Sequence, residues 1–209
     1  WKVSLIGESL ASAVGAGLPV SSATGSMVVD IGGGTTEVGV IALGGMVYSG
    51  SIRVGGDQFD AAIVNYVRNL YGVLIGDQTA EHLKKTIGTA MRNVPLERLN
   101  ATGRSAEDGL PRTVQISNHD IADAIEAPLR HVIGAVKAAL ENAPAELVTD
   151  IFDTGIVLTG GGALLGNLGR RLTAEIGLAV RVADEPLTCA VRGAGAAAGA
   201  GLLDELMYE

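Results

Sequence analysis

Residues 30–40 of this 209-residue chain read DIGGGTTEVGV, and they follow a short apolar run that begins at Val28. A carboxylate, Asp30, therefore stands at the end of a buried strand, beside three glycines and two threonines. Glycines let backbone N–H groups approach a phosphate closely, because no Cβ intervenes and positive φ is accessible. This pattern predicts a phosphate-binding loop whose neighbouring carboxylate holds a magnesium ion through its water shell. The predicted loop residues are Gly32, Gly33, Gly34, Thr35 and Thr36. A tight hairpin capped by Asp30 is the structural alternative.

A second glycine-rich loop occurs in residues 157–165, which read VLTGGGALL. Again a buried strand leads into three glycines and then a helix, an arrangement that presents N–H groups to a ligand. The loop lacks the Gly-Lys-Ser/Thr of a Walker loop, and Leu165 stands where a GxGxxG fingerprint needs glycine. By itself it is equally typical of a structural strand–helix turn. Two such loops, about 130 residues apart, suggest one ligand held between different parts of the fold.

Composition excludes several classes of protein. Hydrophobic residues make up 47% and charged residues 18%, which excludes a disordered chain. The net charge of −8, without a basic block, argues against nucleic acid as a partner. The single cysteine, Cys189, excludes an intramolecular disulfide and fits a reducing cytoplasm. The histidines show no metal-ligand spacing, and no apolar run reaches the length of a membrane span.

Hydrophobic periodicity predicts the secondary structure. Strands are expected at 2–6, 28–31, 35–43, 46–54, 155–159 and 178–182, and a hairpin from 96–101 and 113–117. The strands at 28–54, joined by glycine turns, predict an antiparallel meander. Helices are expected at 8–14, 57–71, 79–90, 118–140, 164–176 and 187–207. Asp57, Thr79 and either Asn118 or Asp120 are the expected helix caps, and Pro128 predicts a kink or a break.

Longer motifs accompany the two loops. They are VGAGLPV at 14–20, ATGSMVVDIGGGTTEV at 23–38, SIRVGGDQFD at 51–60, LIGDQTAEHLKKTIGTA at 74–90, and EPLTCAVRGAG at 185–195. On these motifs the chain resembles the MreB family of bacterial actins, within the actin, sugar-kinase and DnaK superfamily. The resemblance extends over essentially the whole chain.

The resemblance implies an ATP and Mg²⁺ site with catalytic roles for Glu8 and Asp30. Asp30 matches the carboxylate near the metal and the attacking water, and Glu8 matches the glutamate that positions this water. Residues implied to contact the ribose and base are Glu81, His82, Leu83 and Lys84. The adenosine loop is implied to comprise Gly160, Gly161, Gly162, Ala163 and Leu164. Around Glu8 the chain reads IGESLASAV where the family usually has IEEPMAAAI.

The fold implied is α/β, an actin-like (ribonuclease H-like) ATPase fold. Residues 19–54 and 119–187 would form the second-lobe core, and 55–118 a small α+β insertion. Residues 1–18 and 188–209 would be segments of a first lobe that is otherwise missing, since no first phosphate loop of the DLGTANT kind occurs. The chain also begins without methionine and is expected to be a piece of a longer protein.

The function implied is that of an ATP-binding cytoskeletal protein that governs bacterial cell shape. It would form homopolymeric filaments in the cytoplasm, associated with the membrane and with cell-wall synthesis proteins. A sugar or acetate kinase and a DnaK-type chaperone are the alternatives within the superfamily. A further alternative is an interaction piece that binds no ATP, because the first phosphate loop is absent. The intact protein would be an ATPase, and the chain by itself is expected to be inactive.

Overall fold

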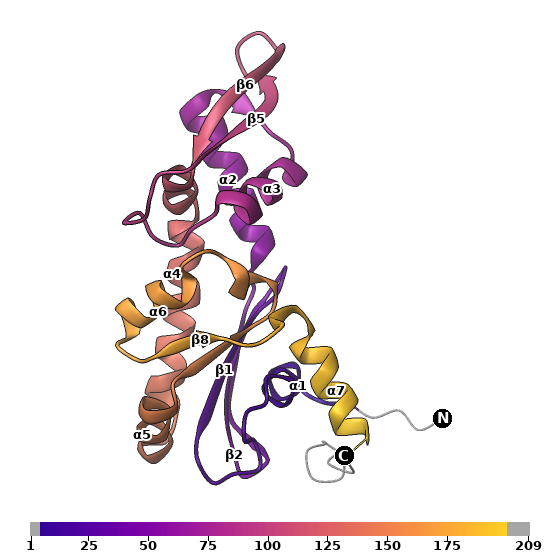
Figure 1. Ribbon diagram of the computed structural model, residues 1–209, viewed down its shortest axis with the longest axis vertical. Coiled ribbons are helices and arrows are strands. Elements are labelled where there is room, and N and C mark those ends of the chain that lie inside the picture. The colour runs from indigo at the N-terminus through magenta and orange to yellow at the C-terminus, as the bar shows by residue number, and fades with distance from the viewer. Residues whose placement is uncertain (1–4, 200–209) are drawn as a thin grey trace.

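The structure, a computed structural model, describes residues 5–199. It contains a five-stranded sheet in the order β3-β2-β1-β7-β8 and a separate three-stranded sheet in the order β4-β5-β6. The molecule is elongated, with the larger sheet toward one end and the β5–β6 hairpin at the other (Figure 1). Within residues 5–199, no helix is both long and apolar enough to cross a membrane.

The larger sheet is mixed. Strands β1 (Ser26–Ile31), β2 (Thr36–Ala42) and β3 (Gly45–Ile52) form an antiparallel meander, which confirms that prediction. On the other side of β1, β7 (Ile156–Thr159) runs parallel to it, and β8 (Val180–Val182) runs parallel to β7. Both glycine-rich loops therefore leave the sheet at the same edge, because the carboxyl ends of β1 and β7 lie side by side.

Two layers of helices cover this sheet, as the alternation of residues along β1 requires. Val29 and Ile31 belong to the main core, whereas Val28 packs into a smaller core on the opposite face. The main core lies under α2 (Gly56–Tyr71), α4 (Asn118–Asn142), α5 (Ala145–Thr154) and α6 (Leu168–Ile176). The opposite face carries α1 (Glu8–Gly15) and α7 (Cys189–Gly199), which pack closely on one another.

The smaller sheet consists of β4 (Val73–Leu74), β5 (Arg98–Ser105) and β6 (Pro111–Ser117). Helix α3 (Asp77–Ile87) and the far end of α2 pack beside it. The predicted hairpin is confirmed, with strands that extend to a turn around residues 106–110. The division of the chain into lobes at residues 55 and 118 stays a prediction.

The expected helix caps are wrong. Helix α2 begins at Gly56 and is capped by Gly55, so Asp57 lies inside the first turn, where its N–H donates to the Gly33 carbonyl at 2.8 Å. Helix α3 begins at Asp77 after Gly76, two residues before Thr79, and ends at Ile87. The cap of α4 is Ser117, whose hydroxyl accepts from the backbone N–H of Asp120.

A kink or a break was expected at Pro128; helix α4 is continuous through this residue, so the break does not occur. Proline removes one backbone hydrogen bond and costs about 3 kcal/mol inside a helix. Ile121 and Ile125 before it, and Leu129 and Val132 after it, are all fully buried in the main core. Packing on both sides of Pro128 therefore outweighs the local cost.

Other boundaries also differ from the predictions. The expected helix 164–176 is a 3₁₀ turn (η1, Gly161–Leu164) followed by α6, since Asn167 has a left-handed φ of 60°. The last expected helix, 187–207, begins as a 3₁₀ turn (η2, Pro186–Thr188) and continues as α7, and its end lies outside the described residues. Most of the strand expected at 2–6 also lies outside them, and residues 5 and 6 form no strand. Helix α5 and strand β4 were not predicted.

A hydrogen-bond cluster joins α2 to α4. The Tyr71 hydroxyl donates to Asp120 at 2.9 Å, and Ser117 contributes further donors to the same carboxylate. Burial raises the pKa of Asp120, but the hydrogen bonds from Ser117, Tyr71 and Tyr66 outweigh it and hold this pKa below the ordinary value of 3.8. Burial, followed by the bond to Asp120, raises the pKa of Tyr71 to about 12 from an ordinary value of 10.

The Tyr71→Phe variant is expected to lose about 1–2 kcal/mol of unfolding free energy at pH 7, because a hydrogen bond to a charged group is lost. A raised Tyr pKa stabilises the fold below pH 10, and this contribution disappears as pH rises through about 12. The difference between parent and variant in urea unfolding should therefore shrink over that interval. Tyr48→Phe is the control, since the Tyr48 hydroxyl makes no hydrogen bond within residues 5–199. A constant difference from pH 7 to pH 12 would contradict the assignment.

Candidate functional site

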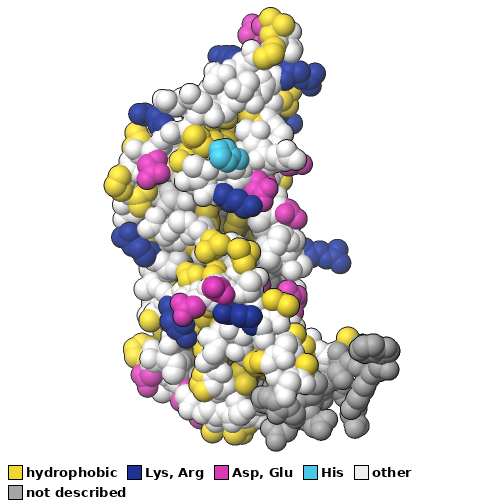
Figure 2. Space-filling model, turned by 45° about the vertical axis from the view of Figure 1, so that its right-hand side comes forward, with side chains coloured by type: hydrophobic (Ala, Val, Ile, Leu, Met, Phe, Trp, Pro, Cys, Tyr) yellow, Lys and Arg dark blue, Asp and Glu magenta, His cyan; other side chains and the backbone are white. Residues whose placement is uncertain are grey.

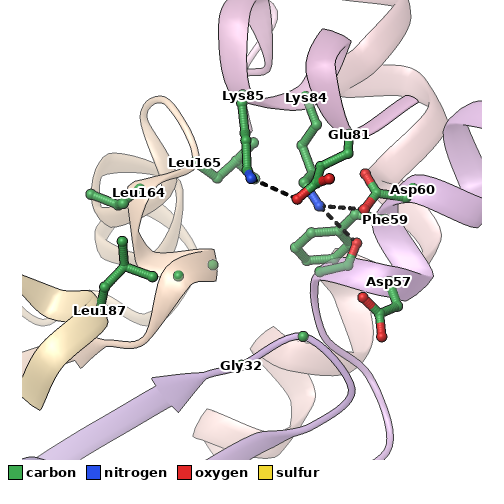
Figure 3. Close-up of a pocket in the computed structure, with 14 residues that line it drawn as sticks. Gly32, Asp57, Phe59, Asp60, Glu81, Lys84, Lys85, Leu164, Leu165 and Leu187 are labelled. Carbon is green, nitrogen blue, oxygen red and sulfur yellow. Dashed lines mark hydrogen bonds and ion pairs between the residues drawn. The ribbon is translucent and has the colours of Figure 1, made fainter. Parts of the chain in front are cut away.

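A pocket of about 510 Å³ opens where the two glycine-rich loops meet helices α2 and α3 (Figure 3). The loops supply its lower and left walls in this view, and side chains of α2 and α3 supply the right and upper walls. The lining residues are Gly32, Gly33, Gly56, Asp57, Phe59, Asp60, Glu81, Lys84, Lys85, Gly161, Gly162, Leu164, Leu165 and Leu187. Two segments far apart in sequence thus face a single cavity, as the pairing of the loops predicts.

The first loop is bound to the start of α2. The Gly32 carbonyl accepts from the Gly56 N–H at 2.9 Å, and the Gly33 carbonyl accepts from the Asp57 N–H at 2.8 Å. Gly55 must be glycine here, because a Cβ would lie 2.5 Å from the Gly33 oxygen. These bonds satisfy N–H groups that a helix N-terminus otherwise leaves free. The N–H groups of Gly56 and Asp57 are therefore occupied by the loop, in which Gly33 is exposed to solvent.

The second loop lies across the end of β1. A Cβ on Gly162 would be 2.2 Å from Cγ2 of Ile31, so only glycine permits this approach. Gly161 and Gly162 line the pocket, and Leu164 and Leu187 stand at its mouth, 58% and 68% exposed. Apolar side chains gather at mid-height on one face of the molecule, with charged side chains above and below them (Figure 2). Such an apolar mouth can receive the flat face of an aromatic ring.

Helix α3 contributes a cation. The Lys84 ammonium donates to Asp60 at 2.7 Å and to the Gly56 carbonyl at 2.9 Å. The side chains of Lys84 and Asp60 are 15% and 14% exposed. Burial raises the pKa of Asp60, although the bond from Lys84 opposes this shift. Glu81 pairs instead with Lys85 at 2.6 Å, on the exposed side of α3 (Figure 3). The residue pair Glu81 and Lys84 therefore lines the pocket without forming an ion pair of its own.

Helical periodicity divides the predicted run 81–84. Glu81 and Lys84 line the pocket, whereas His82 is exposed and Leu83 is fully buried in the main core. Residues three or four apart share a helix face, so four consecutive residues cannot all reach one ligand. Phe59 and Asp60 also line the pocket but were not predicted as site residues, although both belong to the motif SIRVGGDQFD. For Phe59, the spacing of apolar residues in α2 was the available signal.

Some predicted loop residues do not line the pocket. Thr36 is fully buried, and its hydroxyl donates to the Val54 carbonyl at 2.7 Å. This bond links the start of β2 to the residues that follow β3. Ala163, within the second loop, is also buried. Gly34, Thr35 and Gly160 also lie outside the lining, the first of them exposed to solvent.

The predicted catalytic carboxylates, Glu8 and Asp30, lie on the α1 face of the sheet and do not line the pocket. Asp30 is 5% exposed, and its Oδ2 accepts from the hydroxyls of Ser12 and Thr159. Glu37 is the cross-strand partner of Asp30, and Glu8 begins α1. Burial, then the charges of Glu37 and Asp30, raise the pKa of Glu8 above the ordinary value of 4.5. A raised pKa makes a carboxylate a stronger base.

The model of the MreB/Mbl protein family matches residues 1–201. The chain belongs to the MreB/Mbl family. It is 55% identical over 196 residues to the cell shape-determining protein MreB of Escherichia coli strain K12, which covers 94% of this chain and 56% of the relative. The chain thus spans little more than half the length of this MreB relative.

Solved structures of the family have the same fold. A crystal structure of MreB5 of Spiroplasma citri bound to ADP superposes with a TM-score of 0.90 at 34% identity, over 94% of this chain and 60% of that one. The same protein bound to AMPPNP gives a TM-score of 0.88 at 35% identity, over 91% and 57% of the two chains. The actin-like α/β fold that the sequence implied is therefore confirmed for this MreB/Mbl chain.

The described residues of this MreB/Mbl chain fit a magnesium ion through a single carboxylate rather than a full set of protein ligands. Among residues 5–199, no three His, Cys, Asp or Glu side chains are grouped so as to hold a metal ion themselves. One carboxylate suffices where nucleotide phosphates and water supply the remaining ligands, as Mg²⁺ prefers. Asp30 meets this requirement, since Oδ1 receives none of the hydroxyl bonds that occupy Oδ2.

Proposed function

We propose that this chain forms one side of the ATP site of an actin-like cell shape-determining protein. The observation that carries the proposal is the pocket, into which both glycine-rich loops and helix α3 project. Backbone groups of Gly32 and Gly33 would contact phosphates, and Leu164 and Leu187 would pack against the base. Glu81 and Lys84 would contact the ribose and base, with Asp60 beside them.

The family comparison supports a nucleotide as the ligand. The Spiroplasma citri protein is described with ADP and with AMPPNP, and its fold matches this chain closely. Membership of the MreB/Mbl family does not favour the sugar-kinase or DnaK-type alternatives. A bound Mg²⁺ would neutralise charge on the phosphates, Asp30 would hold it through water, and Glu8 would accept a proton from the attacking water.

Calorimetric titration with ATP tests the proposed site. The 209-residue chain should bind ATP weakly or not at all, because the resemblance implies further phosphate contacts from a first lobe. A chain extended by the N-terminal part of the Escherichia coli relative should bind it in a magnesium-dependent manner. Tight binding by the 209-residue chain would show that the site is not divided in this way. No binding by the correctly folded extended chain would contradict the proposed function.

We further propose that the whole protein assembles into ATP-dependent filaments in the cytoplasm. Association with the membrane and with cell-wall synthesis proteins is part of this proposal, which follows from the family resemblance. Sedimentation of the extended chain with ATP or ADP is the test, with pelleting expected only in the ATP sample. A monomer under every nucleotide condition would count against it.

A further inference from the structure

Asp30 is a buried carboxylate whose hydrogen-bond donors are hydroxyl groups. It is 5% exposed, and none of the ion pairs within residues 5–199 includes it. A buried carboxylate is costly unless donors satisfy it. Two hydroxyls supply these bonds, Oγ of Ser12 and, at 2.9 Å, Oγ1 of Thr159, and both donate to Oδ2.

The two donors have different origins. Thr159 is the register partner of Asp30 in the adjacent parallel strand β7, so the sheet itself supplies it. Ser12 comes from helix α1, which packs on β1, and is fully buried. The bond from Ser12 therefore depends on where α1 lies above the sheet.

Close packing fixes the position of α1. A Cβ on Gly15 would lie 1.8 Å from the Cys189 carbonyl oxygen, and a Cβ on Gly193 would lie 1.8 Å from that of Ala11. Glycines thus bring α1 and α7 into backbone contact, beside the sheet (Figure 1). Helices that touch through backbone atoms cannot slide without losing this contact.

The second oxygen of Asp30 faces the other way. A Cβ on Gly160 would lie 2.6 Å from Oδ1, so this oxygen is directed at the first residue of the second loop. The carboxylate is therefore held with Oδ2 toward the two hydroxyls and Oδ1 toward the loop that borders the pocket.

We propose that Ser12 is a positioning residue for Asp30: with Thr159 it occupies Oδ2, and it thereby directs Oδ1 to the hydration shell of nucleotide-bound magnesium. This inference rests on the proposed ATP site. The matched contact on the same helix is that of Ser9, whose hydroxyl donates to Glu37 at 3.2 Å. Ser9 is also buried, but Glu37 has no proposed role with the metal.

The first test compares ATP affinity with Mg²⁺ and with EDTA in the extended chain. Ser12→Ala should reduce the gain in affinity caused by Mg²⁺ by about tenfold, a typical effect of removing a partner of a metal-facing group. Affinity in EDTA should not change, and Ser12→Thr, which keeps the hydroxyl, should retain most of the gain. Ser9→Ala is the control and should match the parent. A Ser12→Ala effect equal to that of Ser9→Ala would overturn the proposal.

The second test needs no nucleotide and uses the 209-residue chain. The urea midpoint of unfolding is measured for Ser12→Ala in the parent and in an Asp30→Ala background, which lacks the acceptor. Two residues in contact show non-additive effects. Unequal midpoint shifts in the two backgrounds support the contact, even if the extended chain were to bind no ATP and the proposed function were wrong. Equal shifts would overturn the positioning role.

Discussion

Replacing Gly160 with alanine is expected to lower the free energy of unfolding by about 3 kcal/mol or more. Gly160 has φ of 79°, a left-handed conformation that side chains rarely adopt. The added Cβ would also lie 2.5 Å from the Ile31 carbonyl oxygen and 2.6 Å from Oδ1 of Asp30. Backbone strain and a steric clash thus act together where β1 and β7 end.

Substitutions at two further glycines distinguish the effect of backbone strain from that of the steric clash. Gly177 has φ of 83°, but no atom lies within 4 Å of a Cβ there, so Gly177→Ala should cost about 1 kcal/mol from strain alone. Gly34 has neither positive φ nor a close neighbour, and Gly34→Ala should change stability by roughly 0.5 kcal/mol or less. Urea unfolding of the three variants measures the differences. A Gly160→Ala cost no greater than that of Gly177→Ala would contradict the close contact with β1.

The second large effect concerns Glu8. In the extended chain, Glu8→Gln is expected to slow ATP hydrolysis by about 100-fold, the range for loss of a general base. Its affinity for ATP should remain that of the parent, because Glu8 does not line the pocket. The comparison requires the hydrolysis rate at saturating ATP and a separate binding titration. A variant that hydrolyses ATP at the parental rate would exclude Glu8 as the base.

The pH dependence of hydrolysis provides a second readout for Glu8. A general base acts in its ionised form, so the rate should fall as pH decreases through the raised pKa of Glu8. After burial, the charge of Glu37 is the next cause of this raised pKa. Glu37→Gln should therefore lower the pKa of Glu8 and move the acidic limb of the profile to lower pH. An unmoved limb would show that another group controls it.

The meander and both glycine-rich loops were predictable because their signals are local. Apolar strands bounded by glycines, as at Val28 to Gly34, specify strand and turn with little help from distant residues. Pairing the loops across the fold was also predictable, since each ends a buried strand of one sheet. The start of α2 and the course of α4 were not, because contacts distant in sequence accompany them. The carbonyl of Gly33, for instance, takes the N–H of Asp57.

In the candidate site, too, some features were predictable from the sequence and others depended on tertiary contacts. Sequence motifs indicated the run 81–84, but only the orientation of α3 determined that Lys84 faces the pocket and Leu83 the core. Asp60 was not predicted, because its place in the site depends on a hydrogen bond from Lys84. That residue is 24 positions away and belongs to another helix. Likewise, no spacing rule links Ser12 to Asp30, which meet only because α1 packs across β1.

The sequence by itself determined the family, the actin-like fold and the two loops that begin at Gly32 and Gly160, because strand patterns and glycine runs act over short distances. Only the tertiary structure decided which side chains share the pocket and how Asp30 is held. Those outcomes depend on the packing of α1, α2 and α3, where backbone approach through glycine and the partners of buried charges are set by residues remote in the chain.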